Sequence, residues 1–296
     1  MTAGFSWNLL ADFQDMWSYL GMVNAFRAGT IVAVLAALVG WFMVLRRQSF
    51  AGHTLAVAGF PGAAAAVLAG LGVAFGYFAF CILAALVIAA LPQRGGRGYT
   101  EESAVIGTVQ AFALAAGMLF IALYKGFLNG TNALLFGSFL GITTGQVATL
   151  ALVGLAALIV LVVIGRPLLF ASIDADTARA HGVPVRAVGA VFLVLLGATA
   201  AEVSQITGAL LVFALLVLPP ATAQLVTPRP ARSLILSVVL ALVTVWVSLF
   251  IAYYSPYPIG FWLATVAFGL YALTYAGTAI HARMGTRAPA PAPAGA

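Results

Sequence analysis

Residues 166–186, with the sequence RPLLFASIDADTARAHGVPVR, form a polar island in a chain that is otherwise almost entirely apolar. Long hydrophobic runs border this island on both sides, so we expect it to connect two membrane spans. Within it, Asp174 is placed to cap the N-terminus of a short helix, and Gly182 with Pro184 is placed to end that helix. A capped helix between two spans is suited to docking on a partner, and an ordinary solvated loop is the alternative interpretation.

The composition excludes a water-soluble globular protein. Hydrophobic residues make up 64% of the chain and charged residues only 7%, whereas soluble domains carry about 25% charged residues. Apolar runs of about 20 residues can cross about 30 Å of hydrocarbon, and these runs lack the alternation of barrel strands. The sequence therefore predicts an all-α polytopic protein of the lipid bilayer. The net charge of +6 reflects arginines at one membrane face and indicates no nucleic-acid partner.

The apolar runs predict nine transmembrane helices, or eight if one block is a re-entrant pair. Residues 1–20 predict an amphipathic helix at the extracytoplasmic interface, residues 21–282 the transmembrane domain, and residues 283–296 a disordered cytoplasmic tail. The short glycine-rich segment 133–144 predicts a re-entrant or interfacial piece. The predicted spans are 22–45, 53–75, 76–91, 103–124, 147–164, 187–201, 210–226, 234–253 and 259–280.

Arginines fall on alternate connections between these spans, and the positive-inside rule assigns such connections to the cytoplasm. The polar island and the C-terminus are therefore expected in the cytoplasm and the N-terminus outside. Only Arg27 and Lys125 are predicted on the opposite side. The arginines expected at the cytoplasmic face are Arg46, Arg47, Arg94, Arg97, Arg166, Arg179, Arg186, Arg229, Arg232, Arg283 and Arg287.

Lys125 is the only lysine, and the sequence around it is not the G-x-x-x-x-G-K-[ST] phosphate-binding loop. If the chain takes part in ATP-driven transport, the ATPase must be another polypeptide. We therefore expect a transport subunit that is not itself an enzyme and that holds no permanent cofactor.

Five segments resemble the zinc/manganese-type permeases of ABC transporters, the ABC-3 family. They are residues 45–53 (LRRQSFAGH), 59–62 (GFPG), 136–138 (FGS), the Asp-x-x-x-Ala-x-x-x-Gly pattern of 174–182, and the block 208–223. The resemblance implies a homodimer of permeases in the bacterial cytoplasmic (inner) membrane, with two cytoplasmic ATP-binding subunits and an extracytoplasmic metal-binding protein. It also implies that residues 174–182 couple the permease to the ATPase, with Asp174, Asp176, Ala178, Arg179 and Gly182 as the candidate contacts.

The chain departs from the family pattern at the end of the first segment, His53, and four residues later at Val57, where the family usually has Asp and then His. The spacing of four residues places two ligands on one helix face, which suits a transient Zn²⁺ or Mn²⁺ site. One imidazole does not complete a zinc site. Either another residue completes it, or binding is weaker, or the substrate differs. A two-fold dimer could pair His53 of both copies, or His53 could simply begin a helix at the cytoplasmic interface.

Glu202 is the second candidate metal residue, because an acid at the edge of an apolar span is costly unless it meets water, a countercharge or an ion. With Ser204 and Gln205 it is predicted at the outer turn between the spans 187–201 and 210–226. There it could receive a cation, act in an external gate, or only snorkel to the interface.

Together these features predict the permease subunit of an ATP-driven importer of divalent metal ions, working by alternating access. Zinc is expected ahead of manganese because imidazole suits zinc. The nearest alternative is an ABC permease for a metal chelate or a cobalamin-like ligand. A secondary transporter is disfavoured because the sequence shows no internal repeat and no paired charges within spans.

Overall fold

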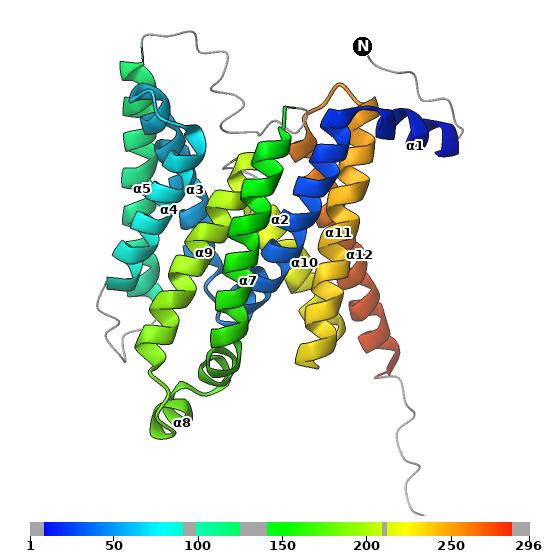
Figure 1. Ribbon diagram of the computed structural model, residues 1–296. Helices are drawn as coiled ribbons and strands as arrows, with labels where there is room; N and C mark the ends of the chain where they lie inside the picture. Colours follow the sequence, from blue (N-terminus) through cyan, green and yellow to red (C-terminus); the bar gives the residue numbers. More distant parts are fainter. Residues whose placement is uncertain (1–8, 91–98, 125–140, 209–211, 286–296) are drawn as a thin grey trace, which may run out of the picture.

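The computed structural model describes residues 9–90, 99–124, 141–208 and 212–285, and these are organised as a bundle of helices (Figure 1). Eight of the described helices are long and apolar enough to cross a membrane, which confirms an all-α polytopic protein. The helices are α1 (Leu9–Ser18), α2 (Leu20–Leu45), α3 (Ser49–Leu68), α4 (Val73–Ala90), α5 (Tyr99–Leu123), α7 (Thr144–Ile173), α8 (Ala175–Ala180), α9 (Val185–Thr207), α10 (Val212–Val226), α11 (Pro230–Tyr254) and α12 (Ile259–Gly285).

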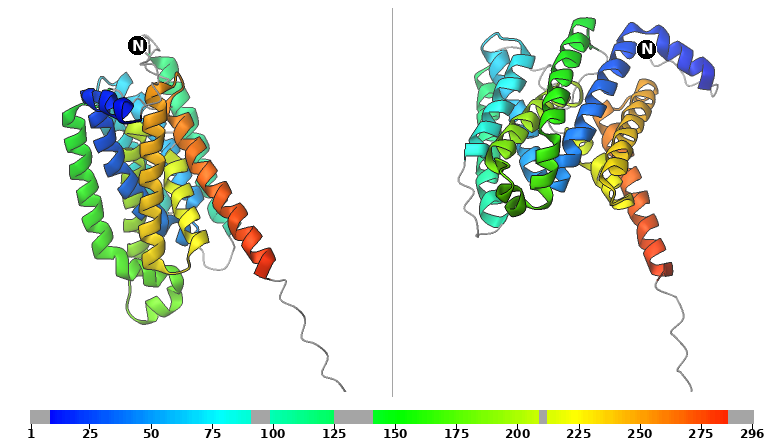
Figure 2. Two further views of the ribbon diagram at one scale, coloured as in Figure 1. Left: turned by 90° about the vertical axis from the view of Figure 1, so that its right-hand side faces the viewer. Right: turned by 60° about the horizontal axis from the view of Figure 1, so that its bottom comes forward.

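The helix α2 runs through the bundle and packs against α7, α9, α10 and α11. On one side of it α3, α4 and α5 form a compact group, with α4 also packed on α9. On the other side α10, α11 and α12 pack together (Figure 2). The helix α10, at the predicted seventh span, has only 15 residues, about 22 Å of helix, so it is shorter than the hydrocarbon layer.

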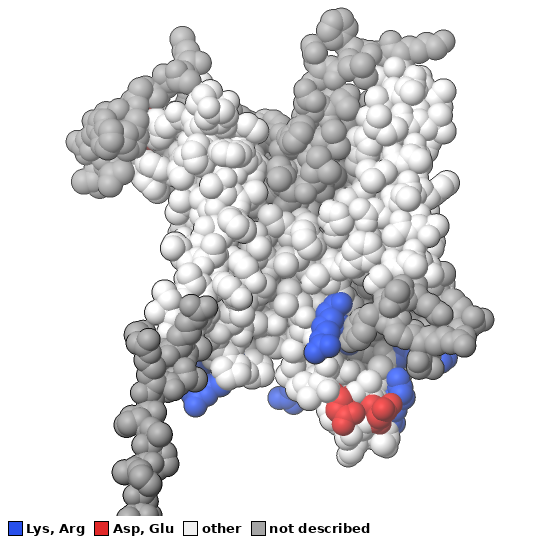
Figure 3. All heavy atoms as spheres, turned by 180° about the vertical axis from the view of Figure 1, so that it is seen from behind, with Lys and Arg blue, Asp and Glu red and all other residues white. Residues whose placement is uncertain are grey.

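Three connections that carry arginines in the described part of the chain lie at one end of the bundle. The turns between α2 and α3, between α7 and α9, and between α10 and α11 share this end, where basic side chains gather in the space-filling view (Figure 3). The relative placement predicted from the sequence is thus reproduced for these three connections. We call this end the arginine-bearing end; its assignment to the cytoplasm remains a prediction.

The boundary between the second and third spans was predicted wrongly at Gly76. The helix α3 ends at Leu68, eight residues before Gly76, because Gly70 adopts φ +69°. The N–H of Gly70 donates to the Val67 carbonyl. The N–H of Leu71 donates to the Ala66 carbonyl, which completes a glycine-terminated helix end. The continuous apolar run concealed this turn.

Gly76 instead lies inside α4, where it makes a close backbone contact with Gly62 of α3. A Cβ atom on either glycine would collide with the carbonyl oxygen of the other. Backbone atoms cannot rotate away as a side chain can, so the two helices approach this closely only because neither residue has a side chain.

Replacing Gly62 with Ala is therefore expected to destabilise the chain by about 1–3 kcal/mol or more, the usual cost of overpacking. Thermal unfolding in detergent measures the effect. The matched control is Gly165→Ala in α7, because an added Cβ there has no atom within 4 Å. That change is expected to be neutral or to stabilise by up to about 1 kcal/mol. Equal stability of both variants would contradict the close packing of α3 and α4.

Two further boundaries differ from the prediction. The polar island does not begin with a loop, since α7 continues through Arg166 and Pro167 to Ile173. The polar turn predicted near Glu202 is also wrong, because α9 continues to Thr207 and ends at Gly208 with φ +76°. The Ser204 hydroxyl donates to the Ala200 carbonyl of its own helix at 2.7 Å. Such local hydrogen bonds let polar residues remain within a buried helix.

The segment predicted to be an interfacial helix near the N-terminus forms the helix α1, and its place at the membrane interface stays a prediction. Phe13 stacks on Phe250 of α11 with ring centroids 6.1 Å apart, and Trp17 lies 5.3 Å from Phe26 of α2. The Tyr254 hydroxyl donates to the Asp12 carbonyl oxygen at 2.7 Å. The helix is therefore fixed to α2 and α11 at the end opposite α8. The predicted re-entrant segment and C-terminal tail lie almost wholly outside the described residues.

Candidate functional site

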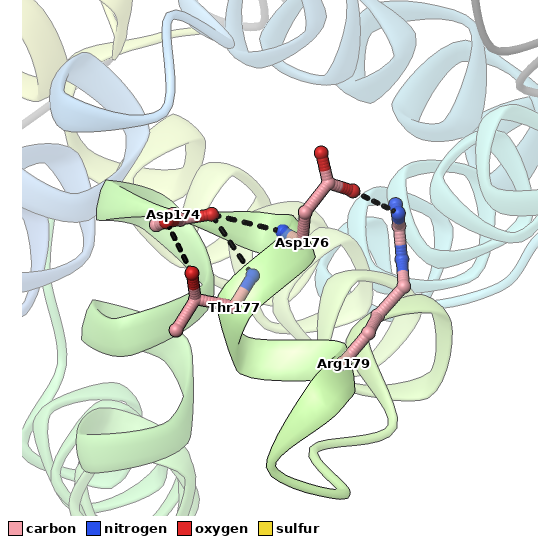
Figure 4. Close-up of polar contacts among 4 residues, drawn as sticks. All are labelled: Asp174, Asp176, Thr177 and Arg179. Carbon is pink, nitrogen blue, oxygen red and sulfur yellow. Dashed lines mark hydrogen bonds and ion pairs between the residues drawn. The ribbon is translucent and has the colours of Figure 1, made fainter.

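The helix α8 begins at Asp174, as the sequence predicted. The Asp174 carboxylate accepts hydrogen bonds from the backbone N–H groups of Asp176 and Thr177 at 3.1 and 3.0 Å, and from the Thr177 hydroxyl (Figure 4). These hydrogen bonds, that of the Thr177 side chain first, lower the pKa of Asp174 from its ordinary value. The stabilisation by the charged cap is therefore present above the ordinary carboxyl range and is lost only as pH falls through the lowered pKa.

The C-terminal end of α8 is equally defined. Gly182 has φ +81°, its N–H donates to the Arg179 carbonyl at 2.9 Å, and the Val183 N–H donates to the Ala178 carbonyl at 3.0 Å. Ala178 is fully buried and anchors the helix on its neighbours. The six-residue helix is thus held at both ends and along one side.

The remaining faces of α8 present charge to the surroundings. Arg179 and Asp176 form an ion pair of 2.6 Å, although their side chains are 60% and 91% exposed. An exposed pair of this kind adds little stability. Because α8 packs on α7 and α9 and projects beyond the bundle (Figures 1 and 2), its charged surface is available to a partner.

His53 lies in the second turn of α3 and is half-buried. Its ring packs edge-on against Phe213 of α10 at 5.0 Å between centroids. Its Nδ1 atom is buried and finds no hydrogen-bond partner among the described residues. Val57, one turn further along α3, is buried, and its side chain offers no ligand. The sequence could not show the Phe213 contact, because α10 is distant in the chain.

Glu202 is fully buried within α9, which corrects its predicted place at an outer turn. Snorkelling to the interface is excluded, since the side chain has no exposed surface. Neither carboxylate oxygen has a hydrogen-bond partner in the described part of the chain. A Cβ atom on Gly154 of α7 would lie 3.1 Å from the Glu202 Oε1 atom and 3.2 Å from Ile31 of α2. The carboxylate therefore lies where α2, α7 and α9 meet, in space that Gly154 leaves open.

The two metal candidates have separate surroundings, since His53 contacts α10 whereas Glu202 faces α2 and α7. Within the described ranges, no group of three or more His, Cys, Asp or Glu side chains is close enough to hold a metal ion. Asn24 of α2 was missed by the sequence analysis. It is buried, donates from Nδ2 to the Ile142 carbonyl at 3.1 Å, and has an Oδ1 atom without a described partner. The sequence feature that could have identified Asn24 is its amide side chain within the largely apolar run 22–45.

Comparisons with known proteins agree on the family. The ABC 3 transport family matches residues 18–277. The manganese transport system membrane protein MntC of Halalkalibacterium halodurans is 26% identical over 268 residues, which cover 90% of this chain and 91% of that protein. The chelated iron transport system membrane protein YfeC of Yersinia pestis is 31% identical over 243 residues, covering 81% and 80%.

A solved structure supports the same conclusion. PsaBC from Streptococcus pneumoniae, in complex with Fab, superposes with a TM-score of 0.80 at 25% identity and covers 90% of this chain and 95% of that chain. The match of sequence and fold over nearly the whole length includes the capped helix α8 and the membrane helices on either side of it. The chain therefore belongs to the ABC 3 transport family, as a multi-pass transport subunit of the bacterial cytoplasmic membrane and not an enzyme.

Proposed function

We propose that this chain is the permease subunit of an ATP-driven importer of divalent transition-metal ions. The observation that carries the proposal is Glu202, a fully buried carboxylate whose two oxygens have no described hydrogen-bond partner. A buried ionised carboxylate is costly unless a proton, a hydrogen-bonding partner or a cation neutralises it, and in this proposal a transported cation does so during the working cycle. The manganese and iron systems for which two relatives are named support a metal cation as the substrate.

In this proposal α8 lies in the cytoplasm and docks a separate ATP-binding subunit. Its caps keep six residues helical, and its exposed Asp176 and Arg179 supply charges for a partner. A second copy of the permease completes the transport route, and an extracytoplasmic binding protein delivers the metal. Closure of the paired ATP-binding subunits displaces α8 and switches the route between its outward and inward states.

Glu202 then acts as a transient cation site on the route. Its carboxylate lies at the junction of three helices, so relative motion of α7, α9 and α2 would change its access to water. A carboxylate in a low-dielectric site attracts a divalent ion strongly, and displacement of the helices releases the ion again. His53, whose buried Nδ1 has no hydrogen-bond partner among the described residues, is a second point of contact or pairs with His53 of the other copy.

The identity of the metal is the finer part of the proposal. Imidazole favours zinc or iron, whereas carboxylate oxygen favours manganese, so the two candidate residues do not select the same ion. Zinc therefore stays a prediction, and manganese and iron stand beside it because of the names of the relatives.

A metal chelate is the second candidate substrate. Val57 removes one of two ligands that the family pattern would supply, which weakens the case for a bare ion at this position. One relative is named for chelated iron. A chelate brings its own ligands and needs fewer from the protein.

Uptake into proteoliposomes that contain the chain with its ATP-binding partner tests the proposal. Zn²⁺, Mn²⁺ and Fe²⁺ are supplied singly, and then as chelates, with ATP or a non-hydrolysable analogue inside or outside to define direction. ATP-dependent accumulation of a free ion supports the metal importer, and accumulation of a chelate alone supports the second candidate. No ATP-dependent uptake of any of these substrates would contradict both.

The role of His53 is tested separately by the metal bound per permease. We expect His53→Ala to lower this stoichiometry or to weaken binding about tenfold, the usual range for a lost ligand contact. The control is Thr54→Val, which alters the neighbouring residue, whose hydroxyl donates to Gln110 at 3.1 Å. Unchanged occupancy and transport in His53→Ala would remove His53 from the route.

A further inference from the structure

Arg46 joins three parts of the chain at the arginine-bearing end. It directly follows α2, and its Nε atom donates to the Gln48 side-chain oxygen at 3.1 Å. Its Nη1 atom donates to the Ser172 hydroxyl of α7 at 3.3 Å. Its guanidinium carbon lies 5.6 Å from the centre of the Phe192 ring of α9, within the range of a cation–π contact.

The surroundings of the guanidinium are shaped to admit it. Gly189 of α9 has no side chain, and a Cβ atom there would lie 3.4 Å from the Arg46 Nη2 atom. The Ser172 hydroxyl donates its own proton to the Leu168 carbonyl, so its oxygen is oriented to accept from Arg46. The guanidinium thus lies between the last turn of α7 and the beginning of α9.

These two helices hold α8. Ser172 precedes the α8 cap, Asp174, by two residues, and Gly189 follows the start of α9 by four residues. Because α8 packs on α7 and α9, a displacement of α8 moves the residues that surround the guanidinium.

On its other side Arg46 belongs to a rigid turn between α2 and α3. The N–H of Arg47 donates to the Val44 carbonyl, and the N–H of Gln48 donates to the Met43 carbonyl at 2.9 Å. Arg47 has φ 57°, a conformation usually reserved for glycine, so the turn is fixed even at some cost in backbone energy. The helix α3 starts immediately after this turn and carries His53 in its second turn.

We propose that Arg46 is a positioning residue that transmits displacement of α8 to the start of α3. The proposal rests on the proposed function of α8 as the dock of the ATP-binding subunit. Arginine suits the task because its planar guanidinium donates hydrogen bonds from its edge while its face contacts an aromatic ring. Lysine offers a single ammonium and cannot make the same set of contacts at once.

The first test compares transport with ATP hydrolysis in the complete importer. The Arg46→Gln and Arg46→Lys variants are expected to bind the ATP-binding subunit and to hydrolyse ATP as the wild type does. The number of metal ions transported per ATP hydrolysed is expected to fall at least about fivefold. Arg47→Gln is the matched control, because it removes the same charge from the adjacent, exposed residue. Gly189→Leu, which fills the space of the guanidinium from α9, is expected to reproduce the Arg46→Gln result.

A second measurement uses the permease without its partner. Spin labels at Ala180→Cys in α8 and Phe50→Cys in α3, in a Cys81→Ala background, report the distance between the two elements; residues 180 and 50 are exposed. The distance distribution is expected to broaden in Arg46→Gln and to stay narrow in Arg47→Gln.

The two measurements separate the possible failures. If the wild-type importer shows no ATP-driven transport, the proposed function fails. Independently of that result, an unchanged distance distribution in Arg46→Gln would overturn the proposal that Arg46 links α8 to the start of α3. If wild-type importer transports and Arg46→Gln moves as many ions per ATP, the transmission role of Arg46 is overturned even if the distribution broadens. Reduced coupling with a broadened distribution supports the proposal.

Discussion

Replacing Glu202 with Met is expected to lower metal uptake by more than about tenfold while leaving the fold at least as stable as the wild type. Methionine matches the length and volume of glutamate but carries no charge. Neither oxygen of Glu202 has a described hydrogen-bond partner, so its removal breaks no hydrogen bond that the structure shows. An apolar group removes the cost of burying a carboxylate without a partner, so the change is expected to be neutral or stabilising.

Uptake and thermal unfolding are measured on the same preparations. The control is Gln205→Met in the same helix, whose amide makes a long contact of 3.5 Å to the Ala201 carbonyl; the uptake of this variant is expected to remain unchanged. Glu202→Asp, which keeps the charge but shortens the side chain, is expected to retain part of the uptake. Loss of stability in Glu202→Met with normal uptake would assign Glu202 a structural role instead.

Asp174→Ala is the change expected to act most strongly on the proposed partner. It removes every hydrogen bond shown for the Asp174 side chain and costs about 1 kcal/mol of helix stability. A helix of six residues cannot absorb that loss of stability, because short helices in water are only marginally stable. Binding of the ATP-binding subunit is therefore expected to fall about fivefold, since 1.4 kcal/mol corresponds to a factor of ten and the loss here is about 1 kcal/mol.

Co-purification of the ATP-binding subunit with the permease measures this effect. Thermal unfolding of the permease itself is expected to be nearly unchanged, because α8 lies outside the bundle core. Asp174→Asn is the matched control: asparagine caps helices about as well as aspartate and should restore binding. Equal binding by Asp174→Ala would mean that α8 is not the dock.

Much of the fold could be predicted from the sequence because it depends on composition and local chemistry. The apolar runs identify the membrane helices, and Asp174 with Gly182 identifies both ends of α8. The error at Gly76 has a local cause: the turn at Gly70 is formed by apolar residues, so the hydropathy of the sequence does not mark it. The error at Glu202 arose because polar residues were taken to break α9, whereas Ser204 satisfies its hydroxyl within the helix.

The candidate site was harder to predict, since its contacts join residues far apart in the chain. His53 meets Phe213, Glu202 lies beside Gly154, and Arg46 reaches Ser172. Each residue could be noticed in the sequence by its charge or polarity. Its neighbours depend on how the helices pack, and one amino-acid sequence without its fold does not specify them.

The most direct test of the central claim is the metal content of cells in which the gene is present, deleted, or replaced by Glu202→Met. We expect deletion to lower cellular zinc, manganese or iron under metal limitation, the wild-type gene to restore it, and Glu202→Met to fail although the protein is produced at normal levels. Unchanged content and uptake of all three metals in the deletion strain, with the partner ATP-binding subunit present, would contradict a role in importing these metals.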